Sequence, residues 1–398
     1  MEKVKLGDVS KLINGDRGRN YPSQADINED GEIPFVNAGH LNGREIDFSE
    51  MNFISQDKYD NLRSGKFQEG DILYCLRGSL GKKAIVSNDV NGAIASSLVI
   101  IRPDKEKIDG EYLMFALDSP AIKEQLVKAN NGSSQPNLSA ASVREYQVEL
   151  PNISVQKEVV EKLIKVRKII DCRRKELQLL DGLIKARFVE MFGDPQINPF
   201  VWDVVNISEV VGGRVSNGFF AKRDDYVDDG NVRVLGVANI VNRMYSNVDE
   251  LPRTNAEYKD IEKFDVRYGD MLFCRSSLVT EGIGKASIIP ENVQENVLFE
   301  CHVIRLPLNL RKCVPEFMQT LSTMDFFRNQ VIAQSKTATM TTIGQDGILK
   351  TNIILPPLDK QREFYAFVKQ VDKSKVAVQR SLDEIQKLFD SLMQKYFG

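Results

Sequence analysis

The side chains best suited to chemistry in this chain are basic and amide residues that stand beside glycines. Such clusters occur at residues 17–20, 40–44 and 77–83, and a polar loop follows at residues 133–137. Arginine, lysine, asparagine and glutamine hydrogen-bond to base edges and phosphates, and an adjacent glycine lets the backbone approach a phosphate closely. These clusters therefore favour recognition of a nucleic acid over covalent catalysis. The alternative for any single Arg or Lys is an ordinary solvated surface residue.

Residues for metal or nucleotide chemistry are scarce. The two histidines, His40 and His302, are too few for a histidine-based metal site, and we interpret both as structural or incidental. The chain has no Walker A motif, so ATP-driven activity is not expected. Gly282-Ile283-Gly284 is a weak glycine pattern that indicates a hairpin turn. We therefore expect no metal and no cofactor in this chain.

The elements that position the polar clusters are duplicated. The pattern Leu-Pro-x-x-x-x-Gln-x-Glu begins at residue 150 and again at residue 355, a shift of 205 residues that continues without a gap for about forty residues. Upstream, Gly-Asp-Ile-Leu at residues 70–73 returns as Gly-Asp-Met-Leu at residues 269–272. A two-copy chain predicts a molecule with two-fold pseudo-symmetry, and duplex DNA is the commonest two-fold symmetric partner.

The repeated segments 151–193 and 356–398 predict two long helices. Their apolar residues recur at spacings of three and four, which is typical of a coiled-coil seam. About 33 residues at 1.5 Å each would span about 50 Å. If the helices pair antiparallel, the globular domains lie at opposite ends, related by a rotation near 180°. The expected seam consists of Val159, Leu163, Val166, Ile170, Leu177, Leu180 and Ile184 with Phe364, Val368, Val371, Val378, Leu382, Ile385, Phe389 and Leu392.

A basic residue interrupts each seam, at Arg173 and at Lys375. Each side chain could carry its charge out to solvent along the helix surface. The sharper hypothesis is that the two residues fix the register of the helix pair.

The remaining segments, 1–150 and 194–355, predict globular domains of mixed α/β (α+β) class. Helical segments are expected near residues 112–128 and 316–333. Short strands are expected at residues 33–36, 71–76 and 98–101 of the first copy, and at 232–237, 271–274 and 302–306 of the second.

Composition is ordinary for a soluble cytoplasmic protein, with 42% hydrophobic and 27% charged residues and no apolar run long enough for a membrane span. Five cysteines without a C-x-x-C spacing indicate reduced thiols. Cys75 and Cys274 stand at equivalent positions of the repeat, where we expect small buried side chains.

Net charge alone argues against a nucleic-acid-binding protein. The whole chain carries −3, with −5 and −4 in the globular segments and +4 and +2 in the helical ones. Any surface for DNA must therefore come from local clustering, or be completed by a partner protein.

The layout resembles the specificity (S) subunit of Type I restriction-modification systems over essentially the whole chain. The match is carried by the two Gly-Asp-[Ile/Met]-Leu strands, by Gln135-Pro136-Asn137-Leu138 and by the Leu-Pro-x-x-x-x-Gln-x-Glu helix starts. The second copy departs at the third motif, where residues 340–343 read Met-Thr-Thr-Ile, and this weakens the transfer of a role to that loop.

The resemblance implies a DNA-recognition subunit without catalysis of its own. Target recognition domains at 1–150 and 194–355 would each read one half of a split target, and the helical regions 151–193 and 356–398 would set the gap. Two modification subunits would methylate adenine with S-adenosylmethionine, and restriction subunits, where present, would add cleavage. The chain agrees by omission, because it has no Asn-Pro-Pro-Tyr or Asp-Pro-Pro-Tyr motif, the nearest being Asn198-Pro199-Phe200.

Candidate DNA-binding residues follow from this resemblance and from the chemistry of base and phosphate contacts. In the first domain they are Arg17, Arg19, Asn20, His40, Asn42, Arg44, Arg77, Ser79, Lys82, Lys83, Ser133, Ser134, Gln135 and Asn137. In the second they are Arg214, Asn217, Lys222, Arg223, Asn239, Asn242, Arg243, Arg275, Ser276, Lys285, Lys336, Thr339, Thr341 and Thr342. Phe219 and Phe220 could touch a thymine methyl, but we expect both in the core.

Two alternatives stay open. One is a self-contained methyltransferase or nuclease, which the missing motifs disfavour. The other is a coiled-coil scaffold whose globular domains bind polypeptide, which would show no sequence-dependent binding of duplex DNA.

Overall fold

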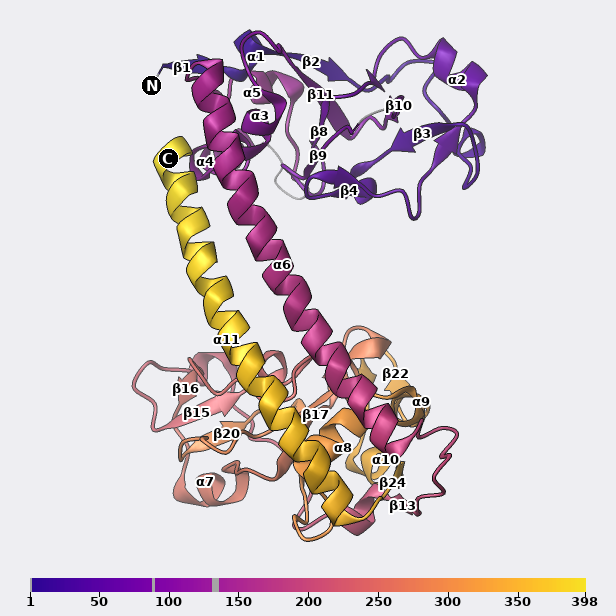
Figure 1. The fold of residues 1–398 in the computed structure, drawn as a ribbon, viewed down its shortest axis with the longest axis vertical. Coiled ribbons are helices and arrows are strands. Elements are labelled where there is room, and N and C mark those ends of the chain that lie inside the picture. The colour runs from indigo at the N-terminus through magenta and orange to yellow at the C-terminus, as the bar shows by residue number, and fades with distance from the viewer. Residues whose placement is uncertain (1, 88–89, 131–135) are drawn as a thin grey trace. The chain divides into compact units, whose positions relative to one another are not determined.

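The computed structural model describes residues 2–87, 90–130 and 136–398. The chain divides into two compact units, one formed by Met1–Arg174 with Arg380–Gly398 and the other by Lys175–Gln379 (Figure 1). Each unit therefore contains one globular domain together with a part of each long helix. The two units are described separately.

The described part of the first unit is built on four small sheets, of which one is the antiparallel pair β4-β5. A central antiparallel sheet has the order β2-β11-β8-β9, a second has the order β6-β3-β10-β7 with β3 and β10 parallel, and β1 pairs with β12. Its elements are β1 (Lys3–Lys5), α1 (Leu6–Val9), β2 (Ser10–Asn14), β3 (Ile33–Val36), β4 (Leu41–Asn42), β5 (Glu45–Ile46), β6 (Phe53–Ile54), α2 (Gln56–Asn61), β7 (Lys66–Phe67), β8 (Ile72–Cys75), β9 (Lys83–Ile85), β10 (Gly92–Ile94), β11 (Leu98–Pro103), α3 (Gly110–Ala116), α4 (Pro120–Ala129), α5 (Ala140–Arg144) and β12 (Gln147–Glu149).

The second unit repeats most of this topology and adds a three-stranded sheet with the order β18-β23-β22. Its central sheet has the order β14-β21-β17-β19, its second sheet the order β16-β15-β20 with β15 and β20 parallel, and β13 pairs with β24. Its elements are β13 (Val204–Asn206), β14 (Ser216–Asn217), β15 (Val232–Leu235), β16 (Arg253–Thr254), α7 (Tyr258–Phe264), β17 (Asp270–Cys274), β18 (Ser276–Ser277), β19 (Ala286–Ile288), β20 (Val297–Phe299), β21 (Val303–Pro307), α8 (Pro315–Ser322), α9 (Asp325–Ala333), β22 (Lys336–Thr337), β23 (Thr341–Thr342), α10 (Gln345–Leu349) and β24 (Asn352–Ile354).

The mixed α/β class and all six expected strands are confirmed, with ends that differ by a few residues. The helices expected near 112–128 and 316–333 are each two helices, α3 with α4 and α8 with α9. In the first copy Pro120 disfavours a helical residue 119, and Ser119 instead caps α4 by accepting from Ile122 N. In the second copy Ser322 and Thr323 donate to the carbonyls of Gln319 and Thr320, which ends α8.

The long helices are α6 (Ile153–Phe192) and α11 (Leu358–Phe397), each of 40 residues. Both are longer than the 33 residues expected, because each begins two residues after the proline of the repeated Leu-Pro pair and continues to Phe192 or Phe397. The predicted seam residues are buried or partly buried in the unit to which each belongs.

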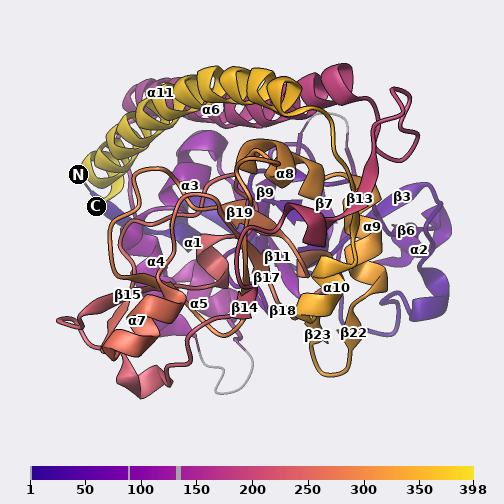
Figure 2. The ribbon, with the colours of Figure 1, turned by 90° about the horizontal axis from the view of Figure 1, so that it is seen from below.

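Each globular core includes helix residues from both α6 and α11. In the second unit, Phe188 stacks on Phe317 of α8 with ring centroids 5.4 Å apart and meets Phe364 edge-on at 5.6 Å. Figure 2 shows α8 between these helix segments and the central sheet. In the first unit, Phe397 of α11 lies 5.0 Å from the ring of Tyr112 in α3. The helices are therefore parts of the domain cores rather than separate linkers.

The repeated glutamine of the helix starts has a structural role. Gln156 is fully buried, donates from Nε2 to Lys107 O (3.0 Å) and Pro151 O (2.8 Å), and accepts from Asp109 N (2.8 Å). Gln361 makes the equivalent bonds, donating to Lys312 O and Pro356 O and accepting from Val314 N. Each glutamine thus joins the start of a long helix to the loop before α3 or α8.

Candidate nucleic-acid interface

The described candidate residues fall into three groups by exposure. Exposed side chains are those of Arg17, Arg19, Asn42, Arg77, Ser79, Asn137, Arg214, Lys222, Arg223, Asn242, Arg243, Lys336, Thr339 and Thr342. Partly buried are those of Asn20, Arg44, Lys82, Asn217, Asn239, Arg275, Ser276 and Lys285, and buried are those of His40, Lys83 and Thr341. Ser133, Ser134 and Gln135 lie outside the described residues.

In the first unit, two of the predicted clusters lie side by side. Arg77, directly after β8, forms an antiparallel bridge with Asn137 of the Gln-Pro-Asn-Leu motif. Leu138 N donates to Leu76 O (2.8 Å), and Gly78 N donates to Pro136 O (3.3 Å). Gly78 has φ +80°, a conformation that favours glycine. The end of β8 and the polar loop are therefore joined by backbone bonds, which leaves the side chains of Arg77 and Asn137 exposed.

The second unit makes the same junction in spite of its different motif. Ser276 pairs with Thr342 and Ser277 with Thr341, while β22 adds Lys336 opposite Thr342. Ile343 N donates to Arg275 O (3.0 Å), as Leu138 does to Leu76 in the first copy. The departure from Gln-Pro-Asn-Leu therefore changes the side chains offered at this junction but keeps its backbone pairing.

A second pair of loops is also equivalent between the units. Ile85 N donates to Arg44 O (2.9 Å) in the first unit, and Ile288 N donates to Met244 O (2.8 Å) in the second. Beside these loops, Lys82 Nζ donates to Ala38 O (3.0 Å), whereas Lys285 Nζ donates to the side chain of Asn242 (2.7 Å). The candidate lysine thus lies next to the candidate asparagine loop in the second unit.

Arg44 and Lys83 have partners inside the first unit. Arg44 pairs with Glu111 and lies 4.5 Å above the ring of Phe115, and burial lowers its pKa to about 10. Lys83 is buried and pairs with Asp118, and burial lowers the pKa of its ammonium group. Both charges are therefore already compensated within the domain.

His40 has two backbone partners. Its Nδ1 accepts from Asn37 N (3.1 Å), and its Nε2 lies 3.1 Å from Glu50 O. Burial lowers the pKa of the ring, so the neutral imidazole is favoured. These contacts support the structural interpretation of this histidine.

Other candidates stand on separate loops. Arg17 donates to Ser96 O (3.4 Å) and Asn20 to Asn61 O (2.7 Å), which ties the 17–20 cluster to neighbouring turns. In the second unit, Lys222 N donates to Asp225 Oδ2 (2.7 Å) at the start of a short 3-10 turn. The described contacts therefore do not join these clusters to the β8 and β17 junctions.

Phe219 and Phe220 of the second unit differ in burial. Phe219 is partly buried and lies 6.1 Å from the ring of Phe264. Phe220 is 67% exposed, so the expectation that it belongs to the core was wrong. Its neighbour on the chain, Phe219, occupies the available apolar space, which turns Phe220 toward solvent beside Lys222.

The predicted burial of the two equivalent cysteines is confirmed. Cys75 and Cys274 are buried, and burial raises the pKa of both thiols. In the part of the chain that the structure describes, no group of three or more His, Cys, Asp or Glu side chains is arranged to hold a metal ion. Likewise, no described helix is long and apolar enough to cross a membrane.

Comparison with known proteins identifies the repeated architecture. The family model described as Type I restriction modification DNA specificity domain matches twice, at residues 1–181 and 199–387. The EcoKI specificity subunit of Escherichia coli strain K12 is 21% identical over 427 aligned positions, which cover 98% of this chain and 88% of that protein. The StySPI specificity subunit of Salmonella potsdam is 21% identical over 98% of this chain and 87% of its own length.

Solved structures agree at the level of fold. A chain from a study of complex assembly and conformational transition of the type I R-M system superposes over 100% of this chain and 97% of its own, with a TM-score of 0.53 at 18% identity. The S subunit of M. genitalium gives the same TM-score at 11% identity, over 100% of this chain and 96% of its own. With two family matches that together span most of the sequence, the chain belongs to the Type I restriction modification DNA specificity domain family and carries that domain twice.

Proposed function

We propose that this chain is the sequence-specificity subunit of a Type I restriction-modification complex, in which each domain reads one half of a bipartite DNA target. The proposal is carried by the contrast between backbone and side chains at the β8 and β17 junctions. Both junctions keep the same backbone pairing, yet one offers Arg77 with Asn137 and the other Ser276 with Thr342. A conserved scaffold with different donors is what two unlike half-sites require.

We assign target recognition to residues 1–150 and 194–355, and spacing to 151–193 and 356–398. The spacer is proposed to be an antiparallel coiled coil that gives the molecule its pseudo-two-fold symmetry. Contacts within each unit support this direction. In the second unit Lys375 pairs with Asp181 (2.7 Å) while Phe364 lies near Phe192 (5.7 Å), and in the first Arg167 lies 5.5 Å from the ring of Phe389. The Lys375 pair also supports the hypothesis that this residue fixes the register.

The helix length limits the gap between half-sites. Forty residues per helix at 1.5 Å each give a rod of about 60 Å, or about 18 base pairs at 3.4 Å. This is an upper bound, because both ends of each helix lie inside the domain cores. Half-site centres about one helical turn apart, or about 10 base pairs, would keep both domains on one face of the duplex.

Catalysis is proposed to reside in partners that act with this chain in the cytoplasm. Two modification subunits would bind the helical regions and methylate one adenine on each strand, using S-adenosylmethionine, and restriction subunits would supply cleavage where they are present. Leu179 and Leu183 of α6 are 65% and 47% exposed. Apolar side chains so exposed at a spacing of four on one helix face are consistent with a surface that a partner covers.

A domain exchange tests independent recognition. Residues 1–150 would be replaced by the equivalent domain of another family member, and the complex reconstituted with its modification subunit. We expect one half of the methylated motif to change and the other to stay. A change in both halves would contradict independent recognition, and loss of all sequence preference in the wild-type complex would favour the scaffold alternative.

A further inference from the structure

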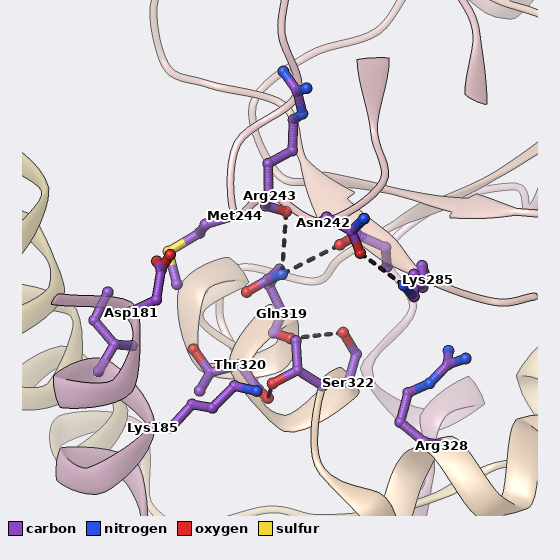
Figure 3. Close-up of a pocket in the computed structure, with 13 residues that line it drawn as sticks. Asp181, Lys185, Asn242, Arg243, Met244, Lys285, Gln319, Thr320, Ser322 and Arg328 are labelled. Carbon is purple, nitrogen blue, oxygen red and sulfur yellow. Dashed lines mark hydrogen bonds between the residues drawn. The ribbon is translucent and has the colours of Figure 1, made fainter. Parts of the chain in front are cut away.

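The second unit contains a cavity beside the helix α6. The cavity has a volume of about 350 Å³ and lies between α6, the loop before β19 and the helices α8 and α9. Three cationic side chains reach it from three elements: Lys185 from α6, Lys285 from the start of β19 and Arg328 from α9 (Figure 3). Gln319 forms part of its wall and donates to Arg243 O (3.3 Å) and Ala286 O (3.2 Å).

The equivalent place in the first unit holds cations that pair with carboxylates. Register and backbone bonds equate Lys83 with Ala286 and Arg44 with Met244, since each pair occupies the same position beside β8 or β17. Asp118, two residues before the start of α4, corresponds to Thr323 before α9. In the first unit Lys83 and Arg44 are paired with Asp118 and Glu111.

The second unit has replaced these large charged groups by methionine, alanine and threonine. These replacements remove two cations and the carboxylate of Asp118 from this place. The cations that remain around it come from other positions in the sequence, so the cavity has an excess of positive charge.

Carboxylate and hydroxyl groups of the lining do not balance that charge. Asp181 lines the cavity but pairs with Lys375 at 2.7 Å. The hydroxyls of Thr320, Ser322 and Thr323 donate to carbonyls of their own helix, so they present lone pairs rather than hydrogens. Donors for a ligand therefore come from the cationic side chains and from the amide group of Asn242, whose oxygen accepts from Lys285.

The guanidinium group of Arg328 is partly removed from water without full replacement of its hydrogen bonds. Its Nη2 donates to Glu281 O (3.0 Å), whereas its buried Nη1 has no hydrogen-bond partner among the described residues. Burial lowers the pKa of this guanidinium group. A buried unpaired donor is costly unless an acceptor joins it.

We propose that this cavity binds a phosphate group of the DNA backbone and anchors the second recognition domain without regard to base sequence. The inference rests on the proposed function and adds Lys185 and Arg328 to its contact residues. The size suits one tetrahedral oxyanion with its hydration, and Lys285 with Asn242 connects the cavity to the candidate DNA-reading loop.

The test uses the reconstituted complex with two separate cavity variants, Lys185→Gln and Arg328→Gln. The charge-matched control is Lys259→Gln, on the helix α7. Each cavity variant should lower the affinity of the complex for target and non-target duplexes alike by about fivefold at 0.15 M salt. It should also lower the magnitude of the slope of log K against log salt concentration by about 1, where K is the association constant for DNA. The methylated motif should stay unchanged. The control should bind as wild type does. Lys185 is exposed on α6, so its variant stays informative if Arg328→Gln impairs folding.

A second arm uses inorganic phosphate on the isolated full chain. We expect phosphate to raise the midpoint of thermal unfolding above that in chloride of equal ionic strength, and both cavity variants to lose the increase. Phosphate stabilisation without an effect of the variants on DNA binding would overturn the backbone assignment, as would variants that fail only to bind the modification subunit. If the wild-type complex shows no sequence preference, the proposed function fails. The salt dependence of DNA binding and the phosphate experiment still decide whether the cavity binds a phosphate group.

Discussion

Phe188 provides the sharpest test of the idea that the long helices are parts of the domain cores. Its ring is fully buried and has three aromatic neighbours, Phe192 at 5.0 Å, Phe317 at 5.4 Å and Phe364 at 5.6 Å. Phe188→Ala removes these contacts and leaves a cavity, at a cost of about 3–5 kcal/mol. A loss of this size is a large fraction of the about 5–15 kcal/mol that stabilises a typical domain.

Hydrogen exchange followed by mass spectrometry can assign the loss to one unit. We expect faster exchange in α8, β17 and residues 175–192, with little change in the first unit. Val189→Ala is the matched control, because the adjacent side chain is 45% exposed and its truncation should change the free energy of unfolding by no more than about 0.5 kcal/mol. Met393→Ala, at the equivalent position of the first unit, should give the reciprocal pattern. Equal effects of Phe188→Ala and Val189→Ala would refute the reasoning.

Two further predictions concern charge and recognition. Burial raises the pKa of the Glu316 carboxyl above its ordinary value of 4.5. The contribution of this group to folding stability is therefore fully present below pH 4.5 and is lost as the pH rises through the folded-state pKa. Glu316→Gln should unfold at a higher temperature than wild type near neutral pH and make the melting temperature depend less on pH, and an unchanged pH dependence in thermal melts would contradict this. Arg77→Ala in the reconstituted complex should weaken binding of the target DNA by about 1–3 kcal/mol and relax specificity in one half-site. Competition with non-target DNA measures this. An equal loss of affinity for all DNA sequences would mean that Arg77 contacts a phosphate rather than a base.

The repeat made much of the fold predictable. A heptad pattern needs only the spacing of apolar residues, so the seam from Val159 to Leu392 could be read before any contact was known. The buried Gln156 and Gln361 are a different matter. Their identity was visible as a motif, but their role in joining each helix to the loop before α3 or α8 depends on contacts with residues 49 positions earlier in the chain.

The candidate site was less predictable, because pairing decides which basic residues are available. Arg44 and Lys83 have the same sequence signature as Arg77, yet Glu111 and Asp118 neutralise the first two. The cavity was missed altogether. From its sequence context, Lys185 is expected to be an ordinary solvated residue of the helix. The neighbouring residues in the sequence do not indicate that Lys285 and Arg328 lie nearby. A comparison of the two copies could have flagged the place, since Asp118 is replaced by Thr323.

The central claim is that two domains read two separate half-sites at a fixed spacing. Co-expression with the cognate modification subunit in a host free of DNA methylation, followed by genome-wide mapping of methyladenine, tests it most directly. The account predicts a split motif with one methylated adenine on each strand and an unread gap shorter than the about 18 base pairs set by the helix length. A continuous methylated motif, or methylation without sequence preference, would contradict it.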